Sequence, residues 1–230
     1  MRKAREGVDA DQVYVIDEAV KLVKQNAAAK FDESIEVAVC LGIDIRHSDQ
    51  MVRVVMMLPN GTGKPLRVAV FAKGNKAKEA QAAGADIVGA EDLAEKIEKG
   101  EIKFDRCIAT PDMMAVVGKL GKVLGRRGLM PNPKSGTVVP PQDVPRVISD
   151  SRKGRVEFRL DRTAIIHAPV GKAAFKESEL LDNLTTLVDA IVRSRPTGVK
   201  GEYIKSAFLS SAMGPSIRLD LSKLLTLKVE

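Results

Sequence analysis

Short apolar segments alternate with segments of helical periodicity between Arg67 and Thr110, and this alternation constrains the fold more than any other feature. Gly84 and Gly100 stand where the two helical segments should end. Strands that alternate with helices predict βαβ units, a parallel sheet and a Rossmann-like layout. We expect strands at 67–72, 86–88 and 106–109, helices at 75–83 and 91–99, and a further helix capped by Thr110 that opens with Pro111.

The two ends of the chain follow a different pattern. Ile35, Val37, Val39 and Leu41 alternate with more polar positions, which predicts a half-buried strand. Further strands are expected at 52–58, 203–210 and 216–221, a hairpin of 156–160 with 163–168 around Asp161 and Arg162, a helix capped by Asp17, and a long helix capped by Ser178 with Leu181, Leu184, Val188, Ile191 and Val192 on one face.

The simplest architecture combines α/β and α+β folds in two domains. Residues 1–66 and 157–230 would form a discontinuous α+β domain, and residues 67–156 an inserted Rossmann-like, three-layer α/β domain. The turn-rich stretch 59–65 suits a hinge between them.

The net charge of +7 and the pI near 9.4 favour a polyanionic partner, most simply a nucleic acid. Six Phe, two Tyr and no Trp offer few platforms for unstacked bases, so a folded RNA or a duplex is favoured over a single strand. No apolar stretch approaches the roughly 18 residues of a membrane span, and no apolar signal region follows the charged N-terminus. We therefore expect a cytoplasmic protein without a membrane partner.

The segment Gly118–Gly136 holds five glycines, five basic residues and no acid. Arg126, Arg127 and Lys134 make it a candidate phosphate-binding loop, although a solvated loop without a ligand is about as probable from composition. It is not a nucleotide-binding P-loop, because Leu120 and Val123 stand where Ser or Thr would have to hold Mg²⁺. A nucleotide-dependent enzyme on the Rossmann-like insert is thus a weak rival hypothesis.

A second candidate site combines residues from both ends of the chain. Phe31 precedes the strand that carries Ser34 and Glu36, and the segment 210–215 joins two later strands. Hydroxyl groups, a close-approach glycine and a flat apolar side chain such as Phe31 or Met213 suit packing on an RNA backbone. The alternative, favoured by local sequence, is a bulge and a turn with Phe31 and Met213 in the core.

The reactive side chains form no supporting pattern for catalysis or metal binding. Cys40 and Cys107 are far apart and are interpreted as reduced thiols in strands, and His47 and His167 are isolated. We therefore expect no enzyme activity, no cofactor and no metal. A DNA-binding module is a further rival, but the sequence has no recognisable recognition helix.

The stretch Leu124–Val138 closely resembles the signature of the ribosomal protein L-one family, the first-numbered protein of the large ribosomal subunit, in its bacterial form. The similarity extends over nearly the whole chain. Further segments that resemble the family are Ala29–Glu33, Ser48–Gln50, Leu58–Lys64, Ile108–Met114, Ile166–Lys172 and Met213–Pro215.

This resemblance implies a structural protein that binds the mobile rRNA stalk near the tRNA exit site, assists the release of deacylated tRNA and represses its own operon mRNA. It also implies a monomer off the ribosome, with the main RNA contacts in the domain built from both termini and Arg126, Arg127 and Lys134 as a secondary basic loop. Ala212 departs from the usual Thr of the family. The implied RNA-binding residues are Lys30, Phe31, Ser34, Glu36, Arg53, His167, Lys172, Ser210, Ser211, Met213 and Gly214.

Overall fold

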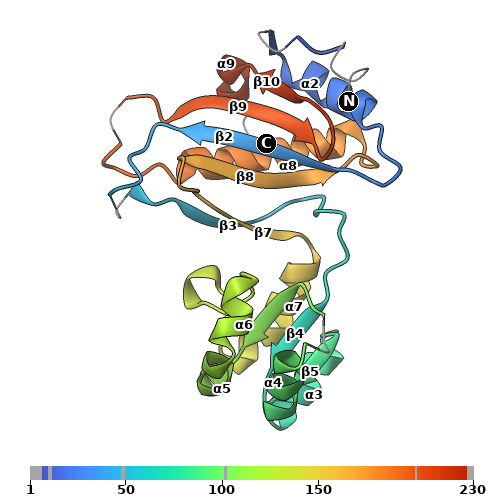
Figure 1. Ribbon diagram of the computed structural model, residues 1–230, viewed down its shortest axis with the longest axis vertical. Helices are drawn as coiled ribbons and strands as arrows, with labels where there is room; N and C mark the ends of the chain where they lie inside the picture. Colours follow the sequence, from blue (N-terminus) through green and yellow to red (C-terminus); the bar gives the residue numbers. More distant parts are fainter. Residues whose placement is uncertain (1–6, 10–11, 48–49, 101–102, 200, 227–230) are drawn as a thin grey trace. The chain divides into compact units, whose positions relative to one another are not determined.

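The computed structural model describes residues 7–9, 12–47, 50–100, 103–199 and 201–226. Ser48 and Asp49, which belong to one family-like segment, lie outside the described residues. The chain divides into two compact units, Met1–Gly63 with Gly154–Glu230 and Lys64–Lys153. Both units combine helices and strands, as predicted, and each is described by itself (Figure 1). That the units fold as independent domains stays a prediction.

The first unit contains a five-stranded sheet in the order β1-β10-β9-β2-β8. Strand β2 lies between two strands from the C-terminal half of the chain and pairs antiparallel with both (Figure 1). The alternation predicted for β2 is confirmed, because Ile35, Val37, Val39 and Leu41 are buried while the residues between them are not. The strands are β1 (Val13–Tyr14), β2 (Ser34–Leu41), β8 (Ile165–Lys172), β9 (Ile204–Ser211) and β10 (Ser216–Leu219).

Helices α2 (Ile16–Asn26), α8 (Glu177–Arg193) and α9 (Leu221–Thr226) share one apolar core with the buried face of this sheet. The predicted caps are wrong. Helix α2 begins after Val15, so Asp17 lies in its first turn, and α8 begins after Lys176, whose N–H donates to Glu179 Oε2 at 2.9 Å. A glutamate thus closes the α8 N-terminus instead of Ser178. Val192, expected on the apolar face of α8, is exposed.

A separate two-stranded sheet pairs β3 (Arg53–Met57) with β7 (Arg155–Arg159). The predicted hairpin of 156–160 with 163–168 is confirmed only at its turn, where the antiparallel bridge Leu160↔Ile166 and the bond from the Asp161 N–H to the Ile165 carbonyl, at 3.0 Å, join the two segments. Beyond this turn β7 pairs with β3 instead of β8. The Asp161 carboxylate accepts the N–H groups of Thr163 and Ile165, each at 2.8 Å, and Ala164 adopts a φ of 60°. This turn redirects the chain, so that β8 pairs with β2 instead of continuing along β7.

The second unit has a three-stranded parallel sheet, in the order β5-β4-β6, with apolar clusters on both faces. Ala69 and Phe71 of β4 pack with α4, α5 and α6, whereas Val68 and Val70 pack with α3 and α7. Burial on both faces explains the continuous apolar run of β4. The elements are β4 (Val68–Phe71), α3 (Asn75–Ala82), β5 (Ile87–Gly89), α4 (Glu91–Glu98), β6 (Arg106–Ala109), η2 (Pro111–Met113), α5 (Met114–Lys119), α6 (Gly121–Arg126), η3 (Pro133–Ser135), η4 (Pro141–Asp143) and α7 (Val144–Arg152).

Thr110 flanks a helix as predicted, but the first turn is the 3₁₀ turn η2 and not an α-helix. The Thr110 hydroxyl makes no capping bond and instead donates to the carbonyl of Phe71 at 3.4 Å. Thr110 therefore ties the end of β6 to the end of β4.

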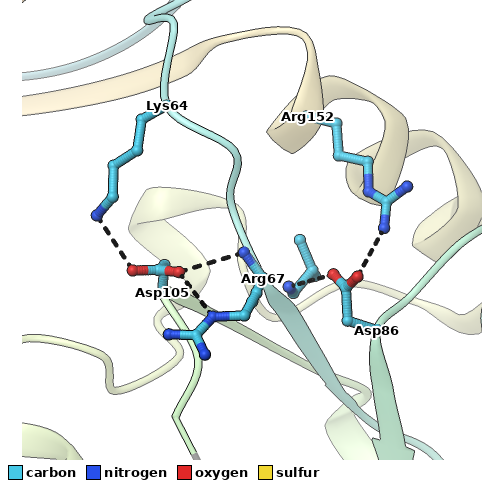
Figure 2. Close-up of polar contacts among 6 residues, drawn as sticks. Lys64, Arg67, Asp86, Asp105 and Arg152 are labelled. Carbon is cyan, nitrogen blue, oxygen red and sulfur yellow. Dashed lines mark hydrogen bonds and ion pairs between the residues drawn. The ribbon is translucent and has the colours of Figure 1, made fainter. Parts of the chain in front are cut away.

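Two aspartates hold the residues where the chain enters and leaves the second unit (Figure 2). Asp105 accepts from Lys64 Nζ at 3.1 Å, from the Arg67 N–H at 3.3 Å and from Arg67 Nε at 3.5 Å. Asp86 accepts from the Val68 N–H at 2.8 Å and from the Arg152 guanidinium at 3.1 Å. Since Asp86 directly precedes β5 and Asp105 directly precedes β6, they anchor the two crossing segments at the N-terminal ends of strands of the parallel sheet.

Candidate nucleic-acid interface

The face of the five-stranded sheet opposite the core carries five of the eleven predicted binding residues, namely Ser34, Glu36, His167, Lys172 and Ser210. Ser34 and Glu36 of β2 alternate with its buried residues, and Glu36 lies opposite Ser210 of β9. On the other side of β2, Ser34 lies opposite Lys172 of β8. Residues opposite each other in an antiparallel pair project to the same face, so these four side chains form one polar surface.

Lys172 and His167 extend this surface along β8. The Lys172 ammonium donates to Ser34 Oγ at 2.9 Å and to the carbonyl of Asp32 at 3.2 Å. His167 lies opposite Ala38, and its Nε2 is 3.7 Å from Asp161 Oδ2. The surface therefore offers hydroxyl groups, a carboxylate and a cation within neighbouring register positions, which suits hydrogen bonding to 2′-hydroxyls and phosphates.

Phe31 and Met213 lie in the loops that adjoin this polar surface, before β2 and after β9. Phe31 is 55% exposed and Met213 is 56% exposed, so the alternative that placed both in the core is wrong. Lys30 is exposed in the same loop as Phe31. Two large apolar side chains in water beside a polar sheet face are suited to packing against a sugar or a base of a folded RNA.

Ser211 and Gly214 pack against each other next to the polar surface. Ser211 lies opposite the buried Ile35 and is itself buried, so the structure does not bring its hydroxyl to the polar surface. A Cβ on Gly214 would meet Ser211 Oγ at 2.4 Å, so any other residue at this point of the turn would displace the Ser211 hydroxyl.

Glu33 is the residue of this region that the sequence interpretation missed. Its side chain is buried, and its two carboxylate oxygens accept the N–H groups of Ala29 and Met213, each at 2.9 Å. Burial on its own raises the pKa of Glu33, but the bonds from Ala29 and Met213, with a smaller contribution from the nearby Ser211 hydroxyl, lower it below its usual value. Glu33 ends the family-like segment Ala29–Glu33 and directly follows Asp32, and nothing in that segment singles it out for this role.

Arg53 lies outside this cluster, on the two-stranded β3–β7 sheet. It forms an ion pair with Glu157, and its Cα partner across the ladder is Arg159. Apolar residues of both strands pack into the same core as the five-stranded sheet. The outward side of the ribbon therefore carries the neighbouring Arg53 and Arg159, with Glu157 at the next outward position of β7.

Arg126 and Arg127 lie in the second unit, at the end of α6, and both are exposed. The expectation of a loop across Gly118–Gly136 is partly wrong, because α5, α6 and η3 occupy much of it. Arg126 Nε donates to the carbonyl of Lys122 at 3.4 Å. The side chain of Lys134 lies outside what the structure describes.

Neither a metal-binding group nor a membrane-spanning helix is found in the part of the chain that the structure describes. There, no group of three or more His, Cys, Asp or Glu could hold a metal ion, and no helix is long and apolar enough to cross a bilayer. Cys40 and Cys107 are free thiols on β2 and β6, and burial raises the pKa of Cys107 to about 12, which keeps it protonated at neutral pH.

Comparison with known protein families identifies a family that covers most of the chain. Residues 23–215 match the sequence model of the Ribosomal protein L1p/L10e family. The matched range begins within α2 and ends just after the Met213 turn, so it includes every predicted binding residue and the whole of the second unit.

Proposed function

Because this chain belongs to the ribosomal protein L1p/L10e family, which comprises non-enzymatic structural proteins of the large ribosomal subunit that bind rRNA, we propose that the polar sheet face of its first unit binds the mobile rRNA stalk. The observation that carries the proposal is the exposure of Phe31 and Met213 beside the polar residues of β2, β8 and β9. Phe31 and Met213 have the two largest exposed fractions among the exposed large apolar residues that the structure describes, and an RNA partner can cover them.

Each group in the proposed interface has a chemical role. Phe31 and Met213 pack on sugars or bases, and Gly214 lets the turn that carries Met213 pack closely on Ser211. Glu36 accepts from a 2′-hydroxyl, which a phosphate could not donate. Lys30, Lys172 and His167 lie nearest to phosphates, Ser34 and Ser210 offer hydroxyl groups, Arg53 extends the interface onto the β3–β7 ribbon, and Ser211 acts through Gly214 instead of touching RNA.

Arg126 and Arg127 belong to a secondary contact in this proposal. They are on the second unit and are available to a phosphate of rRNA or of tRNA at the exit site. Their contribution is electrostatic and independent of sequence, so it adds affinity without much discrimination.

The proposed function is tested by measuring the affinity of the purified protein for a stalk rRNA fragment and for a random duplex RNA of equal length. We expect a preference of about a hundredfold or more for the fragment, on the scale of specific over non-specific nucleic-acid binding. The logarithm of the affinity should fall linearly with the logarithm of the salt concentration. Equal affinities for the two RNAs would contradict the proposal.

Two further activities extend the proposal to the ribosome cycle. We expect that ribosomes lacking the protein release deacylated tRNA more slowly, and that excess protein represses translation of its own operon mRNA. Single-turnover measurement of tRNA dissociation tests the first activity. Cell-free translation of the operon mRNA, with and without the stalk RNA fragment as competitor, tests the second, since the competitor should relieve repression.

We also expect a monomer off the ribosome and a cytoplasmic, ribosome-associated location. Analytical ultracentrifugation of the free protein, over a range of concentrations, tests the oligomeric state. A mass that rises towards that of a dimer would contradict it.

A further inference from the structure

Three chain segments that are far apart in sequence meet beside the polar sheet face. They are the loop before β2, the turn after β8 and the turn after β9. Backbone bonds join them in pairs, with Ala173 N–H donating to the Glu33 carbonyl and Ala212 N–H donating to the Ser34 carbonyl, each at 2.9 Å. The loop before β2 is therefore the central member of the three.

The Glu33 carboxylate makes the third connection, through its side chain. Its Oε1 accepts the N–H of Ala29, two residues before Phe31, and its Oε2 accepts the N–H of Met213 itself, each at 2.9 Å. Ala29 and Met213 are 184 residues apart, counted as 213 minus 29. One buried side chain thus bonds to the backbone of Met213 and to the backbone two residues before Phe31.

This arrangement needs an explanation because a buried carboxylate is costly. Glu33 is only 1% exposed, and removing a carboxylate from water is unfavourable unless strong hydrogen bonds compensate. An apolar residue at the same place would pack without that penalty. The carboxylate does something that an apolar residue cannot, which is to hold two backbone N–H groups of separate segments at fixed positions with charge-assisted bonds.

Burial of Phe31 and Met213 contributes little to ordering their loops, since more than half of each residue is exposed to water. Loops of this kind normally lose conformational entropy when a ligand orders them, and that loss weakens binding. If hydrogen bonds already order the loop backbone in the free protein, this loss of conformational entropy occurs on folding and no longer weakens RNA binding. Affinity and discrimination for a rigid RNA shape both improve as a result.

We propose that Glu33 is a positioning residue for RNA recognition, which holds Phe31 and Met213 in their binding arrangement before the RNA arrives. Glu33 does not touch the RNA and acts through the Ala29 and Met213 N–H groups. This inference rests on the proposed function of the sheet face. It assigns the specificity of the site to a side chain that lies beneath it.

The first test uses the unmodified protein without RNA. Hydrogen exchange at the Ala29 and Met213 amides should be slow, because both N–H groups donate to a buried acceptor. The Ala212 amide, which donates to the Ser34 carbonyl, provides an internal comparison for an amide bonded to a backbone acceptor in the same turn. Exchange of Ala29 and Met213 at the rate of an unfolded chain would overturn the proposal without any variant.

The second test is a double-mutant cycle of Glu33→Gln and Met213→Ala, with affinity for the stalk fragment as the readout. The glutamine amide group faces one of the two N–H donors and breaks that bond, so Glu33→Gln should weaken fragment binding about tenfold or more. Binding to the random duplex should change less than about twofold. In the double variant the two losses should not add, because Met213 is one of the residues that Glu33 positions. Strict additivity would overturn the proposal.

A stability-matched control separates positioning from general destabilisation. Val188→Ala on α8 removes buried apolar volume in the core of the same unit and leaves the sheet face untouched. It should lower the melting temperature and leave fragment affinity within about twofold, as expected for a distant site. If Val188→Ala loses as much affinity as Glu33→Gln, affinity follows stability and the positioning role is refuted.

The affinities of the wild type and of Glu33→Gln for the two RNAs distinguish a failure of the proposed function from a failure of the role of Glu33. A wild type that binds the fragment no better than the random duplex overturns the proposed function and this inference with it. A wild type that discriminates, together with a Glu33→Gln variant that discriminates equally well, overturns only the role of Glu33.

Discussion

The two units use their sheets in opposite ways. In the first unit, helices pack on one face of the five-stranded sheet, and the other face carries Ser34, Glu36, Lys172 and Ser210. In the second unit, apolar clusters lie on both faces of the parallel sheet. A half-buried sheet has a free face on which to arrange polar groups, whereas a sheet covered on both faces must bind through loops and helix ends.

The same contrast appears in the sequence segments that identify the family. The signature-like stretch with Arg126 and Arg127 is in the second unit, where it forms exposed helical surface. The residues that would bind RNA most specifically are in the first unit and are spread along the chain from Lys30 to Gly214. The most recognisable segment and the proposed main binding surface are therefore different parts of the molecule.

The largest expected effect concerns the independence of the two units. Phe71→Ala removes a fully buried side chain from the core of the second unit and should destabilise that unit by about 3–5 kcal/mol. Hydrogen exchange measured by mass spectrometry should show faster exchange across 64–153 with little change in the first unit, and affinity for the stalk fragment should persist. Leu184→Ala, in the core of the first unit, is the matched control and should show the reverse pattern. Loss of protection throughout the chain from either substitution would mean that the units are one cooperative domain.

The second prediction tests which unit holds the main RNA contacts. Met213→Asp places a carboxylate against an anionic partner and removes an apolar contact, so affinity for the stalk fragment should fall by about a hundredfold or more. Arg126→Ala combined with Arg127→Ala should cost about threefold, through lost phosphate attraction alone. Comparable losses from the two variants would contradict the assignment of the main RNA contacts to the first unit.

Leu225→Asp is the matched control for Met213→Asp. Leu225 is a half-exposed apolar residue on α9 of the same unit, so its substitution makes a similar change in charge and polarity. It should leave fragment affinity nearly unchanged. A large loss from Leu225→Asp would show that the effect of Met213→Asp is one of net charge and not of position.

The third prediction concerns the segment by which the chain enters the second unit. Asp105→Asn weakens its bonds to Lys64 and Arg67 and should destabilise the second unit by about 1 kcal/mol at pH 7. The hydrogen bond from Lys64 and that from the Arg67 N–H outweigh burial and lower the pKa of Asp105. The stabilisation is therefore present above the unfolded pKa of about 3.9 and is lost as the pH falls through the folded pKa.

Denaturant unfolding from pH 7 to pH 2.5 measures this effect. The difference between wild type and Asp105→Asn should be constant at neutral pH and should close below about pH 4. Asp112→Asn is the control, because Asp112 also pairs with a lysine at 2.9 Å but its side chain is 70% exposed, and it should cost less than about 0.5 kcal/mol. A gap that widens in acid would contradict the assigned role of Asp105.

The smallest effect distinguishes the glycines of the second unit. Gly125 is inside α6, and an added Cβ would meet nothing within 4 Å, so Gly125→Ala should stabilise the unit by about 0.5–1 kcal/mol. Gly128 follows α6 with a φ of 67°, and Gly128→Ala should destabilise by about 1 kcal/mol. Thermal unfolding measures both. If Gly125→Ala also weakens RNA binding, an RNA backbone approaches α6 more closely than the secondary role allows.

Much of the secondary structure could be predicted because local patterns decide it. The half-buried β2 and the fully buried β4 follow from their apolar periodicity. The errors concern features that depend on partners. Proximity in sequence predicts that β7 pairs with β8, whereas β7 pairs with β3, which lies about a hundred residues earlier. The sequence predicts Ser178 as the cap of α8, whereas the Glu179 carboxylate accepts the backbone N–H of Lys176.

The candidate site was predictable only in part for the same reason. Resemblance to the family indicated Phe31 and Met213, but local sequence favoured placing both in the core, and only the folded chain shows them exposed. Glu33 had no sequence signal, since one acid among thirty is not distinctive until its two hydrogen-bond partners are known. Ser211 looks like Ser210 in sequence, yet the pleat turns it into the interior.

The sequence by itself determined the family, the mixed fold class, the basic charge and the alternation that divides each strand into two faces. These properties are local or additive, so a one-dimensional pattern contains them. The tertiary structure alone decided that β2 lies between β8 and β9, and that one buried carboxylate joins the loops of Phe31 and Met213. Such contacts join residues far apart in the chain, and they depend on strand register and on the direction of individual N–H groups, which composition and periodicity do not specify.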